Sequence, residues 1–440
     1  MTIRAVKSVS LPSWAAPTSP EPLRARVEVP GSKSESNRAL VIGALSEAPS
    51  TIQGVLHARD TELMINALTA LGTGFGVDAD GTVHVTPSEL HAPAEPLDCG
   101  LAGTVMRFVP PIAALTPGVT HFTGDRRAGE RPLAPMLDGL RQLGARIDAD
   151  SIPFALTAPV ELVGRTVKID SSASSQFISG LLLSAARFPR GIDLQHVGNT
   201  VPSAPHIAMT VSILARHGVQ VDADPAAGHW KVSPGPITAV DERIEPDLTN
   251  AAAFLAAGLL TSGSVSIASW PRHTDQPGAL IGAIAARMNA SVTMTPEGFT
   301  ASTPSLSGAV LDLHEASELT PVVSALAVAA RGTTKISGVG HIRGHETDRI
   351  TAIATELSRL GVPVEEHPDG LDIVGMAGRL DELHPSIGDG LFHCYADHRM
   401  AHLGALIGLM VPGVVLDDVT CTSKTMPDFA DRWTRMTESR

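Results

Sequence analysis

The sequence is poor in cysteine and has no long apolar run. Among its 440 residues are three cysteines, Cys99, Cys394 and Cys421, with no Cys-x-x-Cys pair. Scattered cysteines exclude a disulfide framework and favour free thiols in a reducing compartment, so we expect a cytoplasmic protein. One of the longest apolar runs covers only residues 251–260, whereas a membrane helix needs about 20 such residues. We therefore expect no membrane partner.

Aromatic residues and positive charge are also scarce. The formal net charge is −13, and aromatic residues make up 3% of the chain, with one tyrosine. Nucleic-acid-binding proteins need basic surface and stacking rings, so a nucleic-acid partner is excluded. The chain has no Walker motif, no Gly-x-Gly-x-x-Gly after a strand and no His-Glu-x-x-His. These absences argue against a nucleotide-binding fold and against a metal site.

What the chain does contain is one structural unit repeated six times. Short β-like segments are centred on Ile52, Phe122, Leu194, Ile267, Ile336 and Leu416, at intervals of 70, 72, 73, 69 and 80 residues. A helix that is apolar nearly all round, and therefore buried, begins 18 or 19 residues before each centre. An amphipathic helix and a hairpin pattern follow most centres. The repeat predicts an α/β fold, with three units before about residue 243 and three after it.

Polar residues cluster where each buried helix begins. They are Lys33-Ser34, Gly103-Thr104, Ser174-Ser175-Gln176, Asp247 to Asn250, Glu318 and Asp397-His398-Arg399. Helix capping explains Asp247 to Asn250, but it does not explain Lys33, Gln176 or Arg399. If the buried helices pack side by side, their electropositive ends point at one region. We therefore expect anionic ligands in a cleft between two lobes.

Several cations also lie near helix starts, although the protein is acidic. They are Lys33, Arg38, Arg107, Arg131, Arg349, Arg399 and Lys424. Arginine forks match carboxylate and phosphate groups. Glu318 and Glu346 are carboxylates in this basic setting, and they are therefore candidates for acid–base chemistry. A solvated surface position stays open as the alternative for Lys424 and for the arginine-rich loop at 125–132.

These motifs resemble one enzyme family. The match lies in Pro30 to Ser34 with Asn37-Arg38, Ala102 to Arg107, Gly129 to Pro132, Ser174 to Phe177, Glu346 to Arg349, Asp397 to Met400 and Lys424 to Pro427. Over residues 30–430 or so the chain resembles the 5-enolpyruvylshikimate-3-phosphate synthases (3-phosphoshikimate 1-carboxyvinyltransferases). The resemblance implies an enolpyruvyl-transferase fold, an inside-out α/β barrel of two lobes with three βαβαββ units each. It places residues 31–243 in one lobe and residues 1–30 plus 244–440 in the other.

The resemblance also implies an activity and a site. The enzyme transfers the enolpyruvyl group of phosphoenolpyruvate to the 5-hydroxyl of shikimate 3-phosphate by addition and elimination, a step of aromatic amino-acid biosynthesis. Shikimate 3-phosphate is expected at Lys33, Ser34, Arg38, Ser174, Ser175, Gln176, Ser203, Glu318 and His345. Phosphoenolpyruvate is expected at Lys33, Gly103, Arg131, Gln176, Arg349, Arg399 and Lys424. The catalytic candidates are Glu318, Glu346, Lys33 and His398. No cofactor or metal is expected, and the protein is expected to be a monomer.

The sequence departs from the family pattern at several positions. Glu318 stands where Asp is common, and His206, His341 and His345 replace Tyr, Asn and Lys; Leu101 and Phe108 are also unusual. Gly103 is retained, which implies inhibition by glyphosate. The nearest rival is UDP-N-acetylglucosamine enolpyruvyl transferase, but residues 124–132 lack the cysteine that is usual there. A catalytically silent ligand-binding protein on the same fold is the alternative of a different class.

Overall fold

All six apolar centres lie in strands of the computed structural model, which describes residues 13–159, 162–295, 298–385 and 390–439. These strands are β3 (Ser50–Gln53), β7 (Gly118–Thr123), β11 (Ile192–His196), β15 (Ser264–Ile267), β19 (Thr333–Ser337) and β22 (Val415–Leu416). The predicted repeat is therefore confirmed at its centres.

Five of these strands occupy the same place in five four-stranded sheets. The sheet orders are β14-β3-β5-β4, β6-β7-β9-β8, β10-β11-β13-β12, β2-β15-β17-β16 and β18-β19-β21-β20. The central strand pairs in parallel with the edge strand and antiparallel with the hairpin strand on its other side. In the sixth unit β22 pairs antiparallel with β1 (Trp14–Ala15).

The remaining strands form the edges and the hairpins. The edge strands are β2 (Arg24–Val27), β6 (Leu97–Asp98), β10 (Thr166–Ile169), β14 (Glu242–Arg243) and β18 (Val310–Asp312). The hairpins are β4 (Gly74–Val77) with β5 (Val83–Thr86), β8 (Arg146–Ile147) with β9 (Phe154–Ala158), β12 (Val221–Asp224) with β13 (His229–Val232), β16 (Ser291–Thr295) with β17 (Gly298–Ser302), and β20 (Val364–His367) with β21 (Gly370–Val374).

Two sets of helices accompany the sheets. The buried set is α1 (Lys33–Leu45), α3 (Gly103–Ala113), α5 (Gln176–Ala185), α7 (Leu248–Leu260), α9 (Thr320–Ala329) and α11 (His398–Met410). The amphipathic set is α2 (Arg59–Ala70), α4 (Ala134–Leu143), α6 (Pro205–Arg216), α8 (Ile281–Arg287), α10 (Arg349–Leu360) and α12 (Phe429–Glu438). Helices α4 and α10 end at Gly144 and Gly361 in the left-handed conformation, where glycine has no steric penalty.

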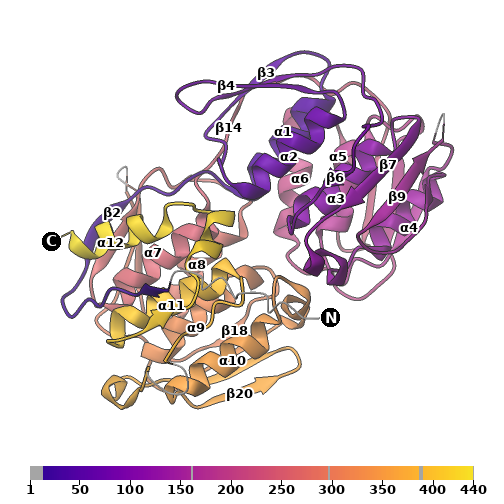
Figure 1. Ribbon diagram of the computed structural model, residues 1–440. Coiled ribbons are helices and arrows are strands. Elements are labelled where there is room, and N and C mark those ends of the chain that lie inside the picture. The colour runs from indigo at the N-terminus through magenta and orange to yellow at the C-terminus, as the bar shows by residue number, and fades with distance from the viewer. Residues whose placement is uncertain (1–12, 160–161, 296–297, 386–389, 440) are drawn as a thin grey trace, which may run out of the picture.

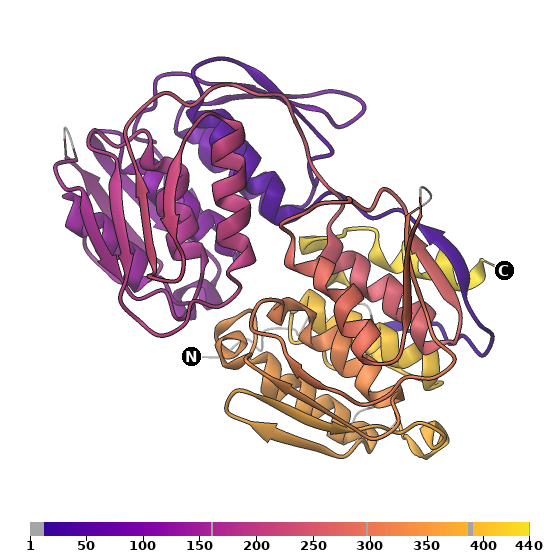
Figure 2. The same ribbon diagram turned by 180° about the vertical axis from the view of Figure 1, so that it is seen from behind.

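The buried residues form two separate cores, and Figures 1 and 2 show two lobes. One core runs from Ala39 to Ile244, and the other combines Ala16 to Val27 with Leu248 to Met436. The chain crosses between the lobes twice, because β2 pairs with β15 and β14 pairs with β3. We propose lobe boundaries at 30/31 and 243/244 on this basis; residues 1–12 lie outside the described part.

None of the helices in the described part of the chain is both long enough and apolar enough to span a membrane.

Candidate active site

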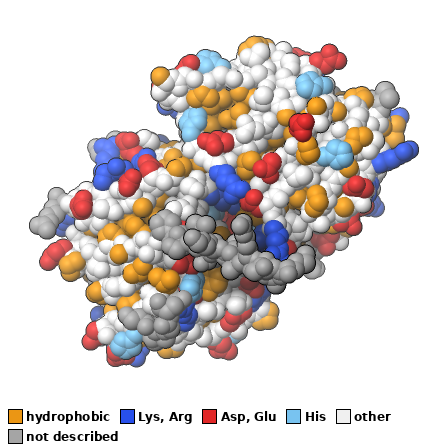
Figure 3. All heavy atoms as spheres, in the orientation of Figure 1, with side chains coloured by type: hydrophobic (Ala, Val, Ile, Leu, Met, Phe, Trp, Pro, Cys, Tyr) orange, Lys and Arg blue, Asp and Glu red, His pale blue; other side chains and the backbone are white. Residues whose placement is uncertain are grey.

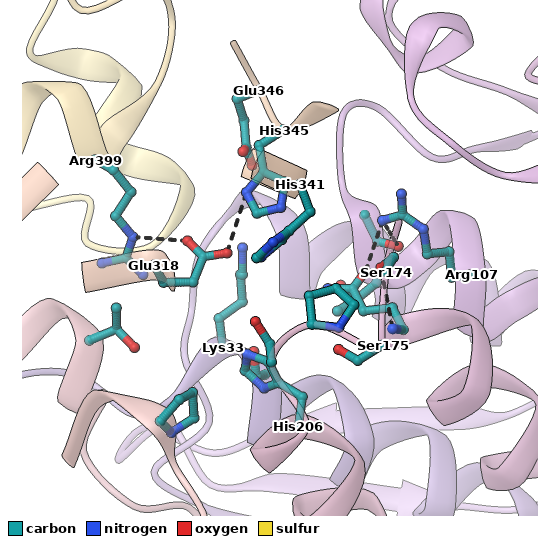
Figure 4. A pocket seen from close by; sticks show the side chains of 18 of the residues that line it. Lys33, Arg107, Ser174, Ser175, His206, Glu318, His341, His345, Glu346 and Arg399 are labelled. Carbon is teal, nitrogen blue, oxygen red and sulfur yellow. Dashed lines mark hydrogen bonds and ion pairs between the residues drawn. The ribbon is translucent and has the colours of Figure 1, made fainter. Parts of the chain in front are cut away.

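The starts of the six buried helices meet at one cavity, as expected from the repeat. At or next to its start, each helix contributes one of Lys33, Gly103, Gln176, Thr249, Glu318 and His398. The wall also includes Ser34, Arg107, Arg131, Ser174, Ser175, Ser203, His206, His341, His345, Glu346, Arg349 and Arg399. Figure 4 shows Glu318 and Arg399 on one side, Ser174, Ser175 and Arg107 on the other, and Lys33 between them. Both lobes therefore supply polar groups to one space.

Two of the expected ligand residues do not reach the cavity wall. Arg38 is buried, and its guanidinium donates to Thr210 Oγ1 at 2.7 Å, to the Ser34 carbonyl at 2.8 Å and to the His206 carbonyl at 2.9 Å. Lys424 lies behind Glu346 and donates a hydrogen bond to its carboxylate. Arg38 thus holds the wall together, while Lys424 acts on the cavity through Glu346.

Arg349 is the centre of the charged side of the cavity. Its buried guanidinium donates to Glu318 Oε2 at 2.7 Å, to Glu346 Oε2 at 2.9 Å and to Asp397 Oδ2 at 2.7 Å. Burial on its own lowers the pKa of Arg349, but these three carboxylates outweigh it and raise that pKa well above the usual value. The planar fork of arginine allows one cation to fix three acids from three segments of the chain.

The two candidate catalytic acids are held in their ionised form. Burial favours a raised pKa for Glu318, but Arg349 and the Arg399 guanidinium, 3.7 Å away, lower it well below its usual range. Burial likewise opposes ionisation of Glu346, and the nearby Lys424 and Arg131 lower its pKa well below the usual value. Without ligands, both groups are therefore carboxylates that can accept protons.

Asp60 bridges lysines from the two lobes. Its buried carboxylate, at the start of α2, lies 3.1 Å from the Lys33 ammonium and 4.0 Å from that of Lys424. Lys33 belongs to α1, whereas Lys424 ends the short helix Thr420–Lys424 of the other lobe. This arrangement keeps two cations beside the cavity at a separation that their mutual repulsion would otherwise increase.

The opposite side of the cavity is rich in hydroxyl and amide groups. Ser174, Ser175 and Ser203 line it together with Gln176. Gln176 accepts a hydrogen bond of 2.9 Å from Arg107, a guanidinium whose pKa is lowered well below its usual value, first by burial and then by Arg131. Hydroxyl donors beside a buried cation are suited to a phosphate group.

Three histidines occupy positions where the sequence departs from the family pattern. Burial lowers the pKa of His206 and of His341 to about 4, and that of His345 to about 3. All three are therefore uncharged at neutral pH. Because Nδ1 of His345 accepts a 3.0 Å hydrogen bond from Arg349, its ring proton lies on Nε2. With an uncharged histidine at position 345, the cavity has one positive charge fewer than it would have with a lysine there. His398 is also neutral, because burial and Arg399 lower its pKa well below the usual value.

Gly103 lies directly under two arginines. A Cβ atom at this position meets Arg107 Nη1 at 2.8 Å and Arg131 Nη1 at 3.2 Å. Any larger residue must displace at least one guanidinium, so glycine allows both cations to face the cavity.

Metal-ligating side chains gather elsewhere. Within the described ranges, Glu365, His367 and Asp372 place ligand atoms within 4.8 Å of one another. They lie on the β20–β21 hairpin, away from the cavity wall. Asp372 already pairs with Lys335 at 2.6 Å, which opposes metal binding there.

The ligand and catalytic residues expected from the sequence did not include Asp60, Arg107, Asn250 or Asp397. Asp397 caps α11 and binds Arg349, and Asn250 accepts a 3.1 Å hydrogen bond from Arg399. Asp397 and Arg107 belong to motifs at the starts of buried helices, so a position near the site was predictable for both. Asp60 gave no such indication, because Lys33 lies 27 positions away.

On the surface, Lys and Arg side chains gather at the junction of the lobes (Figure 3).

Comparisons with known proteins bear on the family and the fold. The family model described as EPSP synthase (3-phosphoshikimate 1-carboxyvinyltransferase) matches residues 17–433. Two structures of EPSP synthase from Acinetobacter baumannii superpose with TM-scores of 0.77, at 22% and 21% identity, over 96% of this chain and 97% and 98% of theirs. The enolpyruvyl transferase NikO from Streptomyces tendae superposes with a TM-score of 0.71, at 18% identity, over 95% of this chain and 96% of its own. At these identities the structures show the fold alone.

Proposed function

Because the chain belongs to the EPSP synthase family, which transfers the enolpyruvyl group of phosphoenolpyruvate to shikimate 3-phosphate, we propose how its cavity divides this reaction among its residues. The observation that carries the proposal is the convergence of six helix starts, from both lobes, on one cavity. Arg349 and Arg399 lie on one side of it, and hydroxyl groups lie beside Arg107 on the other. Two anionic substrates need such a two-sided site.

Phosphoenolpyruvate takes the part of the cavity that lies between Gly103 and Arg349. Arg131, Arg349 and Arg399 hold its carboxylate and phosphate, with Lys33 and Gln176 at its edge; Lys424 supports this set through Glu346. Arginine forks bind such groups in a bidentate manner and stabilise the charge that develops on the leaving phosphate.

Shikimate 3-phosphate takes the hydroxyl-rich side. Ser174, Ser175 and Ser203 donate to its phosphate, with Gln176 beside them. Lys33, Ser34, Glu318 and His345 face its ring hydroxyls. Arg38 contributes to this half by fixing the Ser34 and His206 carbonyls, and not by direct contact.

The addition step needs a base and an acid. Glu318 accepts the proton of the 5-hydroxyl while the hydroxyl oxygen bonds to C2 of phosphoenolpyruvate. In the same step Glu346 delivers a proton to C3. Glu346 is ionised in the free cavity because Lys424, Arg131 and Arg349 compensate its charge. An incoming anion pairs with these cations and weakens their stabilisation of the ionised carboxylate. The pKa of Glu346 then rises, so that Glu346 can carry a proton.

The elimination step reverses the proton transfer at C3. Glu346 recovers the C3 proton as the bond between C2 and the phosphate oxygen breaks. The hydroxyl proton that Glu318 accepted passes to the departing phosphate, so both carboxylates return to their starting form. Lys33 and the neutral His398 line the same space and are the other candidates for proton transfer. The residues present supply every proton, so we propose a reaction without metal or organic cofactor.

Two further assignments complete the proposal. We propose that the protein acts as a monomer, because both halves of the cavity come from one chain. We also propose a cytoplasmic location, because Cys99, Cys394 and Cys421 are free thiols, and such thiols are typical of a reducing compartment.

A phosphate-release assay tests the substrate assignment. The enzyme is expected to release phosphate from phosphoenolpyruvate when shikimate 3-phosphate is the acceptor. It is not expected to do so when UDP-N-acetylglucosamine is the acceptor. Release with UDP-N-acetylglucosamine but not with shikimate 3-phosphate would instead indicate that the protein is a UDP-N-acetylglucosamine enolpyruvyl transferase. No release with either, together with ligand binding, would indicate a silent binding protein.

A further inference from the structure

Two loops from different lobes touch beside the cavity. The Ser203 amide donates to the His314 carbonyl at 3.0 Å, and Nε2 of His314 lies 3.0 Å from the Val201 carbonyl. A carbonyl can only accept, so the His314 ring carries its proton on Nε2. We call residues 201–203 and 314–317 together the interlobe clasp.

The clasp holds Ser203 in an unfavourable backbone conformation. Its φ is 52°, in the left-handed region that L-residues rarely adopt. Such a conformation persists only when surrounding contacts over-determine it, and it is enriched at ligand-binding positions. Here the contacts come from His314, on the other lobe.

Side-chain hydroxyls extend the clasp into a chain. Nε2 of His341 lies 2.8 Å from Oγ of Ser317, and that oxygen lies 3.3 Å from Oγ of Ser203. Ser317 is fully buried, whereas Ser203 lines the cavity. Ser317 is also the residue directly before Glu318. The chain therefore joins the phosphate side of the cavity to the loop of the candidate base.

The hydrogen atoms in this chain can point in only two ways. An anion in the cavity accepts only, so the Ser203 hydroxyl must donate to it. The Ser203 oxygen is then free to accept from Ser317, whose own oxygen accepts from Nε2–H of His341. In the opposite orientation the Ser203 hydroxyl donates its hydrogen bond to Ser317 and has no proton left to donate to the ligand.

We propose that Ser317 is a positioning residue for the phosphate of shikimate 3-phosphate, because it relays the hydrogen-bond orientation from His341 to Ser203 across the two lobes. The inference rests on the proposed function and adds to it a residue that does not touch the substrate. Successive hydrogen bonds in one direction polarise each other, so the Ser203 hydroxyl becomes a stronger donor to the phosphate.

A double-mutant cycle tests this inference. Ser203→Ala, Ser317→Ala and the double variant are compared by calorimetric Kd for shikimate 3-phosphate and for shikimate, which lacks the phosphate. Ser317→Ala is expected to raise the Kd for shikimate 3-phosphate about tenfold and to leave that for shikimate unchanged. In the Ser203→Ala background it is expected to have no further effect, because its action passes through Ser203.

Ser324→Ala is the matched control. Ser324 is also a fully buried serine, but its hydroxyl donates within α9 to the Thr320 carbonyl. It is expected to change thermal stability without changing either Kd. Additive effects of Ser203→Ala and Ser317→Ala, or an equal loss for both ligands, would overturn the inference. Failure of the wild-type protein to bind shikimate 3-phosphate would instead overturn the proposed function.

Discussion

Nη1 of Arg349 donates a 2.7 Å hydrogen bond to Oε2 of Glu318, the candidate base. The same guanidinium binds Glu346 and Asp397, so one side chain sets the charge state of both candidate catalytic acids. A lysine keeps the positive charge but has one nitrogen, which cannot span three carboxylates.

The first prediction concerns Arg349→Lys. We expect kcat/KM to fall by about 100-fold or more. Glu318 must be ionised to act as a base, and Arg349 holds its pKa well below the usual range, although burial opposes this. Weakening that support raises the pKa, so the acid limb of the pH profile of kcat/KM is expected to move to higher pH.

Arg287→Lys, on the exposed end of α8, is the control for this change. It is expected to leave the profile unaltered. If Arg349→Lys loses activity but keeps the acid limb of the wild-type enzyme, Glu318 does not titrate as the base.

The second prediction concerns the cations at the cavity. Lys33→Met and Arg131→Ala are each expected to abolish turnover, because each removes a positive charge that lines the cavity. In the Lys33 variant the buried Asp60 carboxylate still has the Lys424 ammonium as a cationic partner at 4.0 Å, so we expect the fold to survive. Lys335→Met, which breaks an exposed ion pair with Asp372, is the control. Circular dichroism establishes folding and phosphate release measures turnover; normal rates in either site variant would refute the assigned site.

The repeat could be predicted because its determinants are local. Apolar periodicity and a constant spacing fix six strands and six buried helices, and an Asp247 cap binds the Asn250 amide as expected. Packing the buried helices side by side then brings their starts together without any further information from the sequence.

Side-chain direction could not be predicted in the same way. Arg38 follows the start of α1 as expected, but its guanidinium turns to Thr210 and the His206 carbonyl, 172 and 168 positions away. Asp60 is likewise tied to Lys33 only through the tertiary fold. Which partner a buried charge selects depends on long-range packing, and a local motif contains no information about that.

The third prediction concerns glyphosate. Gly103 leaves room for Arg107 and Arg131, whose guanidinium nitrogens lie 2.8 and 3.2 Å from a Cβ built at this position. We expect glyphosate to compete with phosphoenolpyruvate in the natural enzyme. Gly103→Ala is expected to weaken inhibition at least about tenfold and to raise the KM for phosphoenolpyruvate by a smaller factor, because the methyl group narrows that half of the cavity.

Inhibition constants for the two proteins decide this point. Ala102→Gly, at the buried residue before Gly103, provides the comparison for a neighbouring change in volume. An insensitive natural enzyme would contradict the assignment of Gly103 to the phosphoenolpyruvate side.

A buried acid outside the cavity gives a prediction about stability. Glu35 lies in the first turn of α1 and accepts a 2.9 Å hydrogen bond from the Glu245 amide, where the chain crosses between lobes. Burial raises its pKa from 4.5 to about 7, and the nearby Glu245 carboxylate adds to the rise. Arg216 is 3.9 Å away and compensates only in part.

The sign of the pH effect follows from this raised pKa. Between pH 4.5 and about 7 the folded protein holds the Glu35 proton more tightly than the unfolded chain does. Its free energy of unfolding therefore falls as the pH rises through that window, by on the order of 3 kcal/mol at most from this group. Glu35→Gln keeps an oxygen for the Glu245 amide but cannot ionise. Urea unfolding is expected to show this variant as more stable than the natural protein at pH 8 and nearly equal to it at pH 4.5, whereas Glu62→Gln, on the exposed face of α2, changes neither value. Equal stability of the Glu35→Gln variant and the natural protein at pH 8 would mean that Glu35 ionises in the folded state without cost.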